Sequence, residues 1–440
     1  MLYGIKLSGI DLVWSILIIV GVLVVGFMAH FRWITRNVLI IFLLTKLVIG
    51  LGSTVWLISL DVEFDAAGYY RDGQLYADML TDLFKAESRE YLGTTPFWTL
   101  NGTSTDRLGS LTGLFLVLVQ GSFLGATAIA CLFGAVGQLL VYRYFRERFP
   151  QVRPVYFLPI LFHPSFMLWS GMLLKDSFGI FGLGGAVYAL HILLSRQKLS
   201  ALILLLLYLY SILLFRSFIF LPLAALTVFM FWDRVILLYA SMRREGGIVK
   251  ILYLMAGSAI CASVLWTLAA KFGDNLVEDR REGAAIFSQI EAGSSFENTD
   301  LSFSPSGILS LGIGATNCLF RPLPWDVTKP IQAAAALENL VVVCFVVVGF
   351  HCYLRRLTSQ QREQFSGLFW GMLMVALIIA TGVGLFASNS GTISRYRIPM
   401  IPFLVAVPCL ALGMADYFVR MRQHSPRGVH AQQFKMARPT

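Results

Sequence analysis

Long apolar runs are the feature that most constrains what this chain of 440 residues can fold into. A membrane-spanning helix needs about 20 mostly apolar residues, and the sequence can be divided into eleven runs near that length. A hydrophobic share of 57% is typical of a polytopic membrane protein, so we predict an all-α transmembrane fold. The third run is long, and we expect it to begin with a short interfacial helix. The predicted spans are 10–29, 38–60, 112–142, 154–172, 176–194, 199–215, 217–232, 250–270, 331–352, 366–387 and 398–419.

The basic residues divide between the loops in a way that predicts the topology. One alternating set of loops carries 20 Lys and Arg, against 14 on the other side. The positive-inside rule puts the richer set in the cytoplasm, so the N-terminus is expected outside and the C-terminus inside. The net charge of +10 then reflects topology and contact with anionic membrane lipids, and no nucleic-acid partner is expected. The richer loops are 30–37, 143–153, 195–198, 233–250, 353–365 and the segment from 420.

We predict a single transmembrane domain over residues 1–422 with two extracytoplasmic insertions, at about 61–109 and 271–330. Apolar residues at helical spacing between Tyr69 and Phe84 predict an amphipathic helix on the membrane surface. The cytoplasmic loops are short, so any chemistry is expected at the outer face or within the membrane. The tail 423–440 is basic and without periodicity, and is predicted to be disordered.

Metal-ligand patterns are missing from the sequence. The six cysteines and six histidines show no spacing typical of a metal site or a disulfide framework. No cofactor is therefore predicted. A divalent metal stays open as an alternative, because an aspartate pair suits metal-assisted and metal-free chemistry alike.

Charged residues expected at the outer face are the candidates for chemistry, because charge at membrane depth is expensive. Asp65 and Asp72 flank Gly68-Tyr69-Tyr70 at the start of the predicted surface helix, and a carboxylate there could act as general base on a sugar hydroxyl. Arginines could hold a lipid-linked phosphate through paired hydrogen bonds. The phosphate-binding candidates are Lys175, Arg216, Arg321, Arg395 and Arg397.

Each candidate also has a structural explanation. Asp61 and Glu63 are better explained as solvated residues at a helix exit. Lys175-Asp176 could form a tight turn in which Asp176 caps a helix and Lys175 extends toward the interface. Arg216 could simply mark the turn between two short spans.

Three further residues could support a site. Trp325, beside Arg321, is typical of an interfacial anchor. Glu338 falls near the outer end of a predicted span and is a functional candidate, although an ion pair with Arg321 would also explain it. His163 is interpreted as a hydrogen-bonded core residue rather than a ligand.

Several of these segments resemble polytopic bacterial enzymes of cell-surface glycan assembly. The acidic first loop resembles that of membrane glycosyltransferases of the GT-C type, which implies a catalytic base at Asp65 or Asp72. The run Pro164-Ser165 to Lys175-Asp176 is similar to segments of exopolysaccharide membrane proteins. So are Phe320 to Trp325 with Glu338-Asn339, and Ser394 to Pro399. The sequence departs from the GT-C pattern, since the acidic loop follows the second span and the sequence predicts no C-terminal soluble domain.

The resemblance implies a bacterial inner-membrane enzyme. It would transfer a sugar or oligosaccharide from a polyprenyl-phosphate or -diphosphate carrier to a glycan or lipid acceptor. A polymerase of the O-antigen (Wzy-like) or EpsG-like kind is the first alternative, and it would suit the arginines as principal residues. A flippase or exporter of lipid-linked glycans, without catalysis, is the second.

Overall fold

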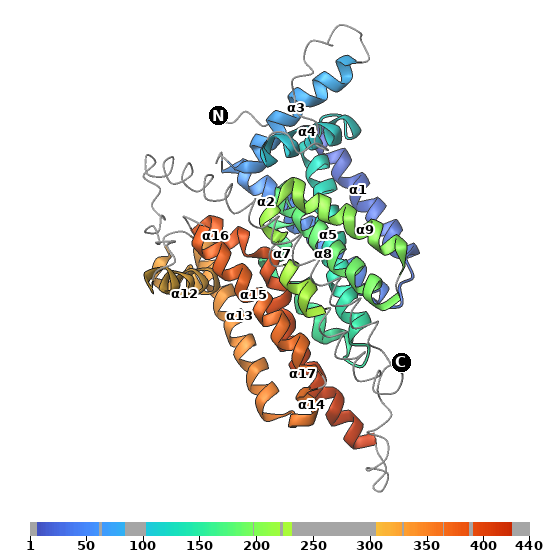
Figure 1. Ribbon diagram of the computed structural model, residues 1–440. Coiled ribbons are helices and arrows are strands. Elements are labelled where there is room, and N and C mark those ends of the chain that lie inside the picture. Colours follow the sequence, from blue (N-terminus) through green and yellow to red (C-terminus); the bar gives the residue numbers. More distant parts are fainter. Residues whose placement is uncertain are drawn as a thin grey trace.

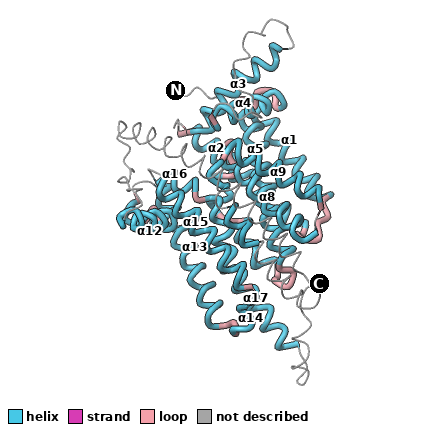
Figure 2. Tube along the Cα trace, in the orientation of Figure 1, coloured by secondary structure: helices cyan, strands magenta, loops and turns pink. Residues whose placement is uncertain are grey.

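A computed structural model describes residues 7–60, 64–83, 103–196, 198–220, 223–230, 305–327, 330–363, 365–386 and 390–424. All regular structure in these ranges is helical, as Figures 1 and 2 show. The all-α prediction is confirmed for this part of the chain. The predicted span 250–270 lies outside the described residues, as does the predicted disordered tail 423–440 apart from its first two residues, which end α17.

Seven of the described helical segments are long and apolar enough to cross a membrane, so the protein is a multi-pass membrane protein. Two shorter apolar helices, α9 (Leu199–Phe215) and the segment Ser217–Met230, accompany them. The predicted count of eleven spans is not reached among the described residues. The long helices are α1 (Gly9–Met28), α2 (Arg36–Ser59), α5 (Phe123–Arg148), α8 (Lys175–Arg196), α13 (Pro330–Arg355), α15 (Ser366–Phe386), and a run of α16 (Ser390–Tyr396), η5 (Ile398–Met400) and α17 (Ile401–His424).

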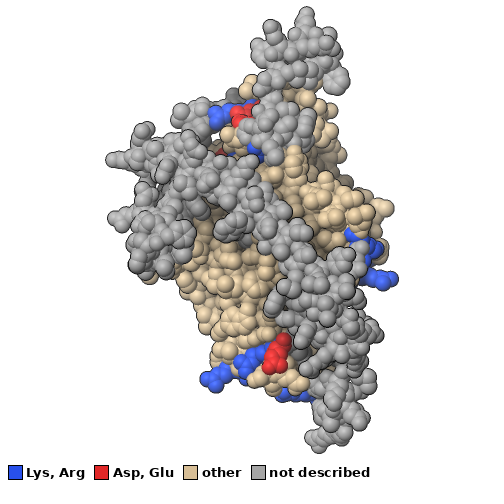
Figure 3. Space-filling view, in the orientation of Figure 1, with Lys and Arg blue, Asp and Glu red and all other residues tan. Residues whose placement is uncertain are grey.

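The surface of the described residues is typical of a membrane protein. On the face shown in Figure 3, the charged side chains of the described residues gather toward the helix ends and leave uncharged surface between them. Large apolar side chains such as Leu12, Val25, Ile203 and Val347 are exposed along α1, α9 and α13. In water such a surface would be unfavourable, whereas lipid tails solvate it.

Helices α3 (Asp65–Leu83) and α4 (Ser104–Leu118) lie at one end of the bundle (Figure 1). They approach closely because glycines line the contact: a Cβ on Gly113 would lie 2.4 Å from Cβ of Tyr76. After α4 the chain turns at Gln120 and Gly121, both with positive φ, and α5 follows. The expected short helix ahead of the third span is therefore present, and it is α4.

The segment predicted to be a continuous span at 154–172 is broken. It consists of η2 (Pro154–Phe157), α6 (Leu158–Leu161) and α7 (Pro164–Trp169), followed by an irregular stretch up to α8. The prediction of one helix there was wrong, because Pro154, Pro159 and Pro164 each remove a backbone donor and favour a new helix start.

These short pieces nevertheless run back along the bundle. Phe157 stacks on Phe145 at 5.7 Å, the Leu161 carbonyl accepts from Gln138, and Ser170 lies against Gly134. The chain thus passes α5 in the reverse direction over roughly 16 Å, at 1.5 Å per residue. We call residues 154–174 the broken crossing.

Polar side chains from two long helices form hydrogen bonds with the groups of the broken crossing. Lys46 of α2, whose side chain is 0% exposed, donates to Gln138 Oε1 at 2.6 Å and to Ser170 Oγ at 2.8 Å. Its ammonium also lies 3.5 Å from the Met167 carbonyl. Irregular backbone inside a membrane protein is tolerated where protein groups take over its hydrogen bonds. This arrangement explains why a lysine lies in the middle of a span.

Glycines make room for the same segment. A Cβ on Gly50 of α2 would lie 2.0 Å from the Gly171 carbonyl oxygen, and one on Gly134 of α5 would lie 2.0 Å from that of Ser170. Backbone can approach backbone this closely only where no side chain intervenes. The stretch that leads into α8 is therefore held between α2 and α5.

The remaining described elements are short. They are α12 (Pro305–Phe320), η3 (Ser217–Ile219), η4 (Pro324–Asp326) and α14 (Ser359–Glu363). The largest apolar core joins α5, the broken crossing, α15 and α17. A smaller core lies beneath α3 and α4 and includes Phe115, Phe123 and Phe178.

Candidate functional site

Five charged residues from separate parts of the chain meet near the end of the bundle that carries α3 and α4. They come from the starts of α3 and α8, the end of α9 and the end of α16. We call them the Asp176 cluster, and they are Asp65, Lys175, Asp176, Arg216 and Arg395.

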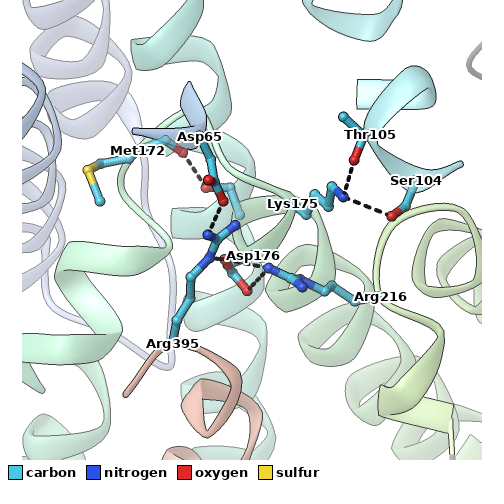
Figure 4. Close-up of polar contacts among 9 residues, drawn as sticks. Asp65, Ser104, Thr105, Met172, Lys175, Asp176, Arg216 and Arg395 are labelled. Atoms are coloured by element: carbon cyan, nitrogen blue, oxygen red, sulfur yellow. Dashed lines mark hydrogen bonds and ion pairs between the residues drawn. The ribbon is translucent and has the colours of Figure 1, made fainter. Parts of the chain in front are cut away.

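Asp176 is the centre of this cluster. Its side chain is only 4% exposed, and Arg216 Nη2 lies 2.8 Å from each of its carboxylate oxygens. Arg395 donates from Nε to Asp176 Oδ2 at 2.6 Å and also forms an ion pair with Asp65 (Figure 4). The alternative in which Asp176 merely caps a helix is wrong, because its carboxylate binds two guanidinium groups instead.

Asp65 differs from Asp176 in its surroundings. Its side chain is 52% exposed, and Arg395 is its partner at the inner side of the cluster. One carboxylate of the cluster is thus enclosed with arginines, while the other faces outward. Environments this different suit two carboxylates for different tasks.

Lys175 points away from Asp176, toward α4 (Figure 4). Its ammonium donates to Ser104 Oγ at 2.9 Å and to Thr105 Oγ1 at 2.7 Å. These partners are uncharged hydroxyls. The cluster therefore holds three cationic side chains and two carboxylates, which leaves one positive charge in excess.

Aromatic rings complete the walls of the cluster. The Arg216 guanidinium lies 4.6 Å from the ring centre of Tyr396, and Tyr396 stacks on Phe218 at 5.4 Å. Tyr69, one turn after Asp65, lies with its ring 5.7 Å from the Lys175 ammonium. Burial, with a smaller effect of the Asp65 charge, raises the pKa of Tyr69 to about 12, so its hydroxyl stays protonated.

Asp72 lies two turns further along α3 than Asp65, and it takes no part in the ion pairs that join Asp65, Asp176, Arg216 and Arg395. It packs against Gly109 of α4. Partial burial raises its pKa, Arg71 opposes that shift, and Asp106 adds to it. The structure thus separates the two aspartates that the sequence placed together. Asp61 and Glu63 lie outside the described residues.

Arg397 forms contacts different from those of Arg395, although only Tyr396 separates them. Its side chain is 3% exposed and binds the Asn339 side-chain oxygen, with the Arg321 carbonyl at 3.5 Å. Asn339 in turn donates to the carbonyls of Phe320 and Arg321. Arg397 therefore fastens the end of α12 to α13.

Glu338 does not pair with Arg321, so that structural explanation is wrong. Its carboxylate lies 2.9 Å from His163 Nδ1 and accepts from Ser165 Oγ at 2.6 Å. Arg321 lies instead 3.6 Å from Asp326, in the loop that carries Trp325. Trp325 is 78% exposed and is free to contact lipid.

Sequence reasoning missed Tyr69, Ser104, Thr105 and Tyr396 as neighbours of the charged residues. Tyr396 was available as a signal, since it stands between two arginines. The pairing of Ser104 and Thr105 with Lys175 had no signal, because 70 residues separate Thr105 from Lys175 in the chain.

Within the described ranges, no three His, Cys, Asp or Glu side chains lie close enough together to hold a metal ion. Comparisons of the chain with protein-family models, with curated proteins and with solved structures find no match. The geometry of the Asp176 cluster is therefore the basis for its chemistry.

Proposed function

We propose that the protein is a membrane glycosyltransferase. It moves a sugar or oligosaccharide from a polyprenyl-phosphate or -diphosphate carrier to a glycan or lipid acceptor. We place the reaction at the outer face of a bacterial inner membrane, in the assembly of cell-surface polysaccharide. The resemblance of the acidic loop to GT-C enzymes supports the proposal, and the Asp176 cluster is its principal support.

The observation that carries the proposal is the combination of excess positive charge with one outward-facing carboxylate. Arg216, Arg395 and Lys175 outnumber Asp65 and Asp176, so a phosphate would balance the cluster. Arginine and lysine bind phosphate oxygens through charge-assisted hydrogen bonds. The long apolar helices around the cluster suit the prenyl chain of such a carrier.

The reaction follows from these roles. Asp65 accepts the proton of the acceptor hydroxyl, and that oxygen forms a bond to the anomeric carbon of the donor sugar. The bond between this carbon and the carrier phosphate oxygen breaks, and its electron pair stays on the phosphate. Arg216, Arg395 and Lys175 stabilise the charge that develops there. Because Arg395 also holds Asp65, a phosphate that draws Arg395 toward itself frees the carboxylate to act as base.

Replacing Asp65 with Asn tests the proposal. We expect sugar transfer to fall at least 100-fold, because general-base catalysis contributes about 10²–10⁴-fold. The measurement is new glycosidic bonds formed by purified protein from a labelled polyprenyl-linked sugar. Asp78→Asn, at an exposed aspartate on the same helix, is the matched control and should keep wild-type transfer. Full transfer by a folded Asp65→Asn protein would remove Asp65 as the base.

Gly179 offers a test of how Arg216 is positioned. A Cβ at this position would lie 2.8 Å from Cγ and 3.1 Å from Cβ of Arg216, so Gly179→Ala should displace this residue. We expect transfer to fall about tenfold, equivalent to about 1.4 kcal/mol, because one phosphate contact is misplaced. The free energy of unfolding should fall by about 1–3 kcal/mol, since Cγ and Cβ of Arg216 lie next to the backbone and the crowding is not relieved by moving the end of the side chain alone. Unchanged transfer would show that the position of Arg216 is unimportant to the reaction.

A Wzy-like polymerase remains the second candidate, since paired arginines suit two lipid-linked glycans. Product length in the same assay separates a polymerase from a single-sugar transferase. A flippase has less support. Lys46, in the middle of α2, binds only uncharged groups and is fully buried, so it lines no polar path.

A further inference from the structure

A polar pocket separate from the Asp176 cluster lies between the start of α7, α13 and the run of α16 to α17. Its polar lining consists of His163, Glu338, Asn339 and Arg397, and apolar side chains of α12, α13, η5 and α17 form the rest. None of these four polar residues belongs to the Asp176 cluster. We call this the His163 pocket.

His163 is buried beside a carboxylate. Its side chain is 7% exposed, and Nδ1 lies 2.9 Å from Glu338 Oε1. Glu338 is itself fixed by Ser165, which donates from its backbone nitrogen at 3.2 Å and from its hydroxyl at 2.6 Å. A carboxylate at Nδ1 favours the proton on that nitrogen, which leaves Nε2 as an acceptor. Among the described residues, neither ring nitrogen has a hydrogen bond of good geometry: Nδ1 has only its close contact with Glu338, and Nε2 has no hydrogen-bond partner.

Arg397 supplies the opposite hydrogen-bonding group. Its side chain is 3% exposed and binds uncharged oxygens of Asn339 and Arg321 through Nη1. Its Nε–H has no partner in the described part of the chain. A buried donor without a partner is unfavourable, and Arg397 and His163 line the same pocket.

One unpaired acceptor and one unpaired donor match a hydroxyl group, which both donates and accepts. We propose that the His163 pocket binds a hydroxyl of the acceptor glycan. This hydroxyl donates to His163 Nε2 and accepts from Arg397 Nε–H. The inference rests on the proposed transferase function, and it names the place where the acceptor is recognised.

The chain connects this pocket to the Asp176 cluster twice. Arg395 and Arg397 lie two residues apart, and residues 163–176 carry His163 at one end and Asp176 at the other. An acceptor held by one hydroxyl in the His163 pocket would lie beside the chain segments that carry Asp176 and Arg395. The two sites thus have separate tasks, recognition in the first and transfer in the second.

The test measures binding without turnover, with the full chain in an Asp65→Asn background. Methyl glycosides of glucose, galactose, mannose and N-acetylglucosamine are the probes. Nitrogen-15 NMR of labelled histidines follows His163 Nε2, assigned by its loss in His163→Ala or His163→Gln, and the exposed His30 serves as the control. We expect at least one glycoside to shift the His163 signal and leave that of His30 unchanged.

Deoxy glycosides then locate the hydroxyl without any change to the protein. We expect one monodeoxy analogue to bind at least tenfold more weakly than its parent glycoside, because His163 Nε2 and Arg397 Nε–H are left without the hydroxyl. In the folded His163→Ala protein, parent and analogue should bind equally. A silent His163 signal with all four glycosides, or an undiminished deoxy penalty in His163→Ala, would mean that the pocket holds water only and would overturn the inference. Glycoside binding without any transfer by the wild-type protein would instead overturn the proposed function alone.

Discussion

Replacing Asp176 with Asn is expected to reduce the free energy of unfolding by about 3–5 kcal/mol, because it leaves a buried arginine without its counter-ion. Asp176 binds both Arg216 and Arg395, and its side chain is 4% exposed. Arg395 keeps Asp65, whereas the ion pair of Arg216 is lost. Sugar transfer should also be abolished, since Arg216 is released and Arg395 is then held by Asp65 alone. Reversible unfolding in mixed detergent and SDS micelles measures the change.

A double variant separates lost charge pairing from general disruption. In Asp176→Asn with Arg216→Gln, both partners are neutral and can hydrogen-bond to each other. We expect this protein to recover a large part of the stability that Asp176→Asn loses. Unfolding of the single variant within about 1 kcal/mol of wild type would contradict the assignment of Asp176 as the centre of the cluster.

Gly50→Ala is the second substitution with a large expected effect. The new Cβ would lie 2.0 Å from the Gly171 carbonyl oxygen, so α2 and the broken crossing must move apart. Overpacking costs about 1–3 kcal/mol and more where backbone must shift, so we expect a loss near the upper limit. The same displacement would move Lys175 and Asp176, which follow a few residues later.

The matched control lies on the same helix. A Cβ on Gly52 would have no described atom within 4 Å, so Gly52→Ala meets open space. Alanine favours a helix over glycine by up to about 1 kcal/mol, and this variant should be as stable as wild type or slightly more stable. Equal unfolding free energies of Gly50→Ala and Gly52→Ala would show that the close approach to Gly171 is unimportant.

Much of the fold could be predicted from the sequence because the bilayer sets helix length. The predicted span 199–215 coincides with α9, and 10–29 differs from α1 by one residue at each end. The broken crossing escaped prediction since apolar composition alone does not distinguish a straight helix from short helical pieces. Pro154, Pro159 and Pro164 were the available warning.

The sequence indicates which charged residues belong to the candidate site, but not which of them form ion pairs with each other. Charge at the ends of apolar runs singled out Asp65, Asp176, Arg216 and Arg395, which the structure brings together. The division between Arg395 and Arg397 depends on how α16 meets η5, and no local pattern encodes that geometry. His163 was interpreted as hydrogen-bonded core, yet its Nε2 has no partner among the residues that the structure describes.

The broken crossing has a consequence for the order in which the protein is made. Its pieces are too short and too interrupted to enter lipid as a helix on their own, since free carbonyls there would have no donors. Lys46 and Gln138, which satisfy it, lie on α2 and α5, and both helices precede it in the chain. The partners are therefore already synthesised when residues 154–174 leave the ribosome. We therefore expect the broken crossing to insert after α2 and α5, by packing against these two helices.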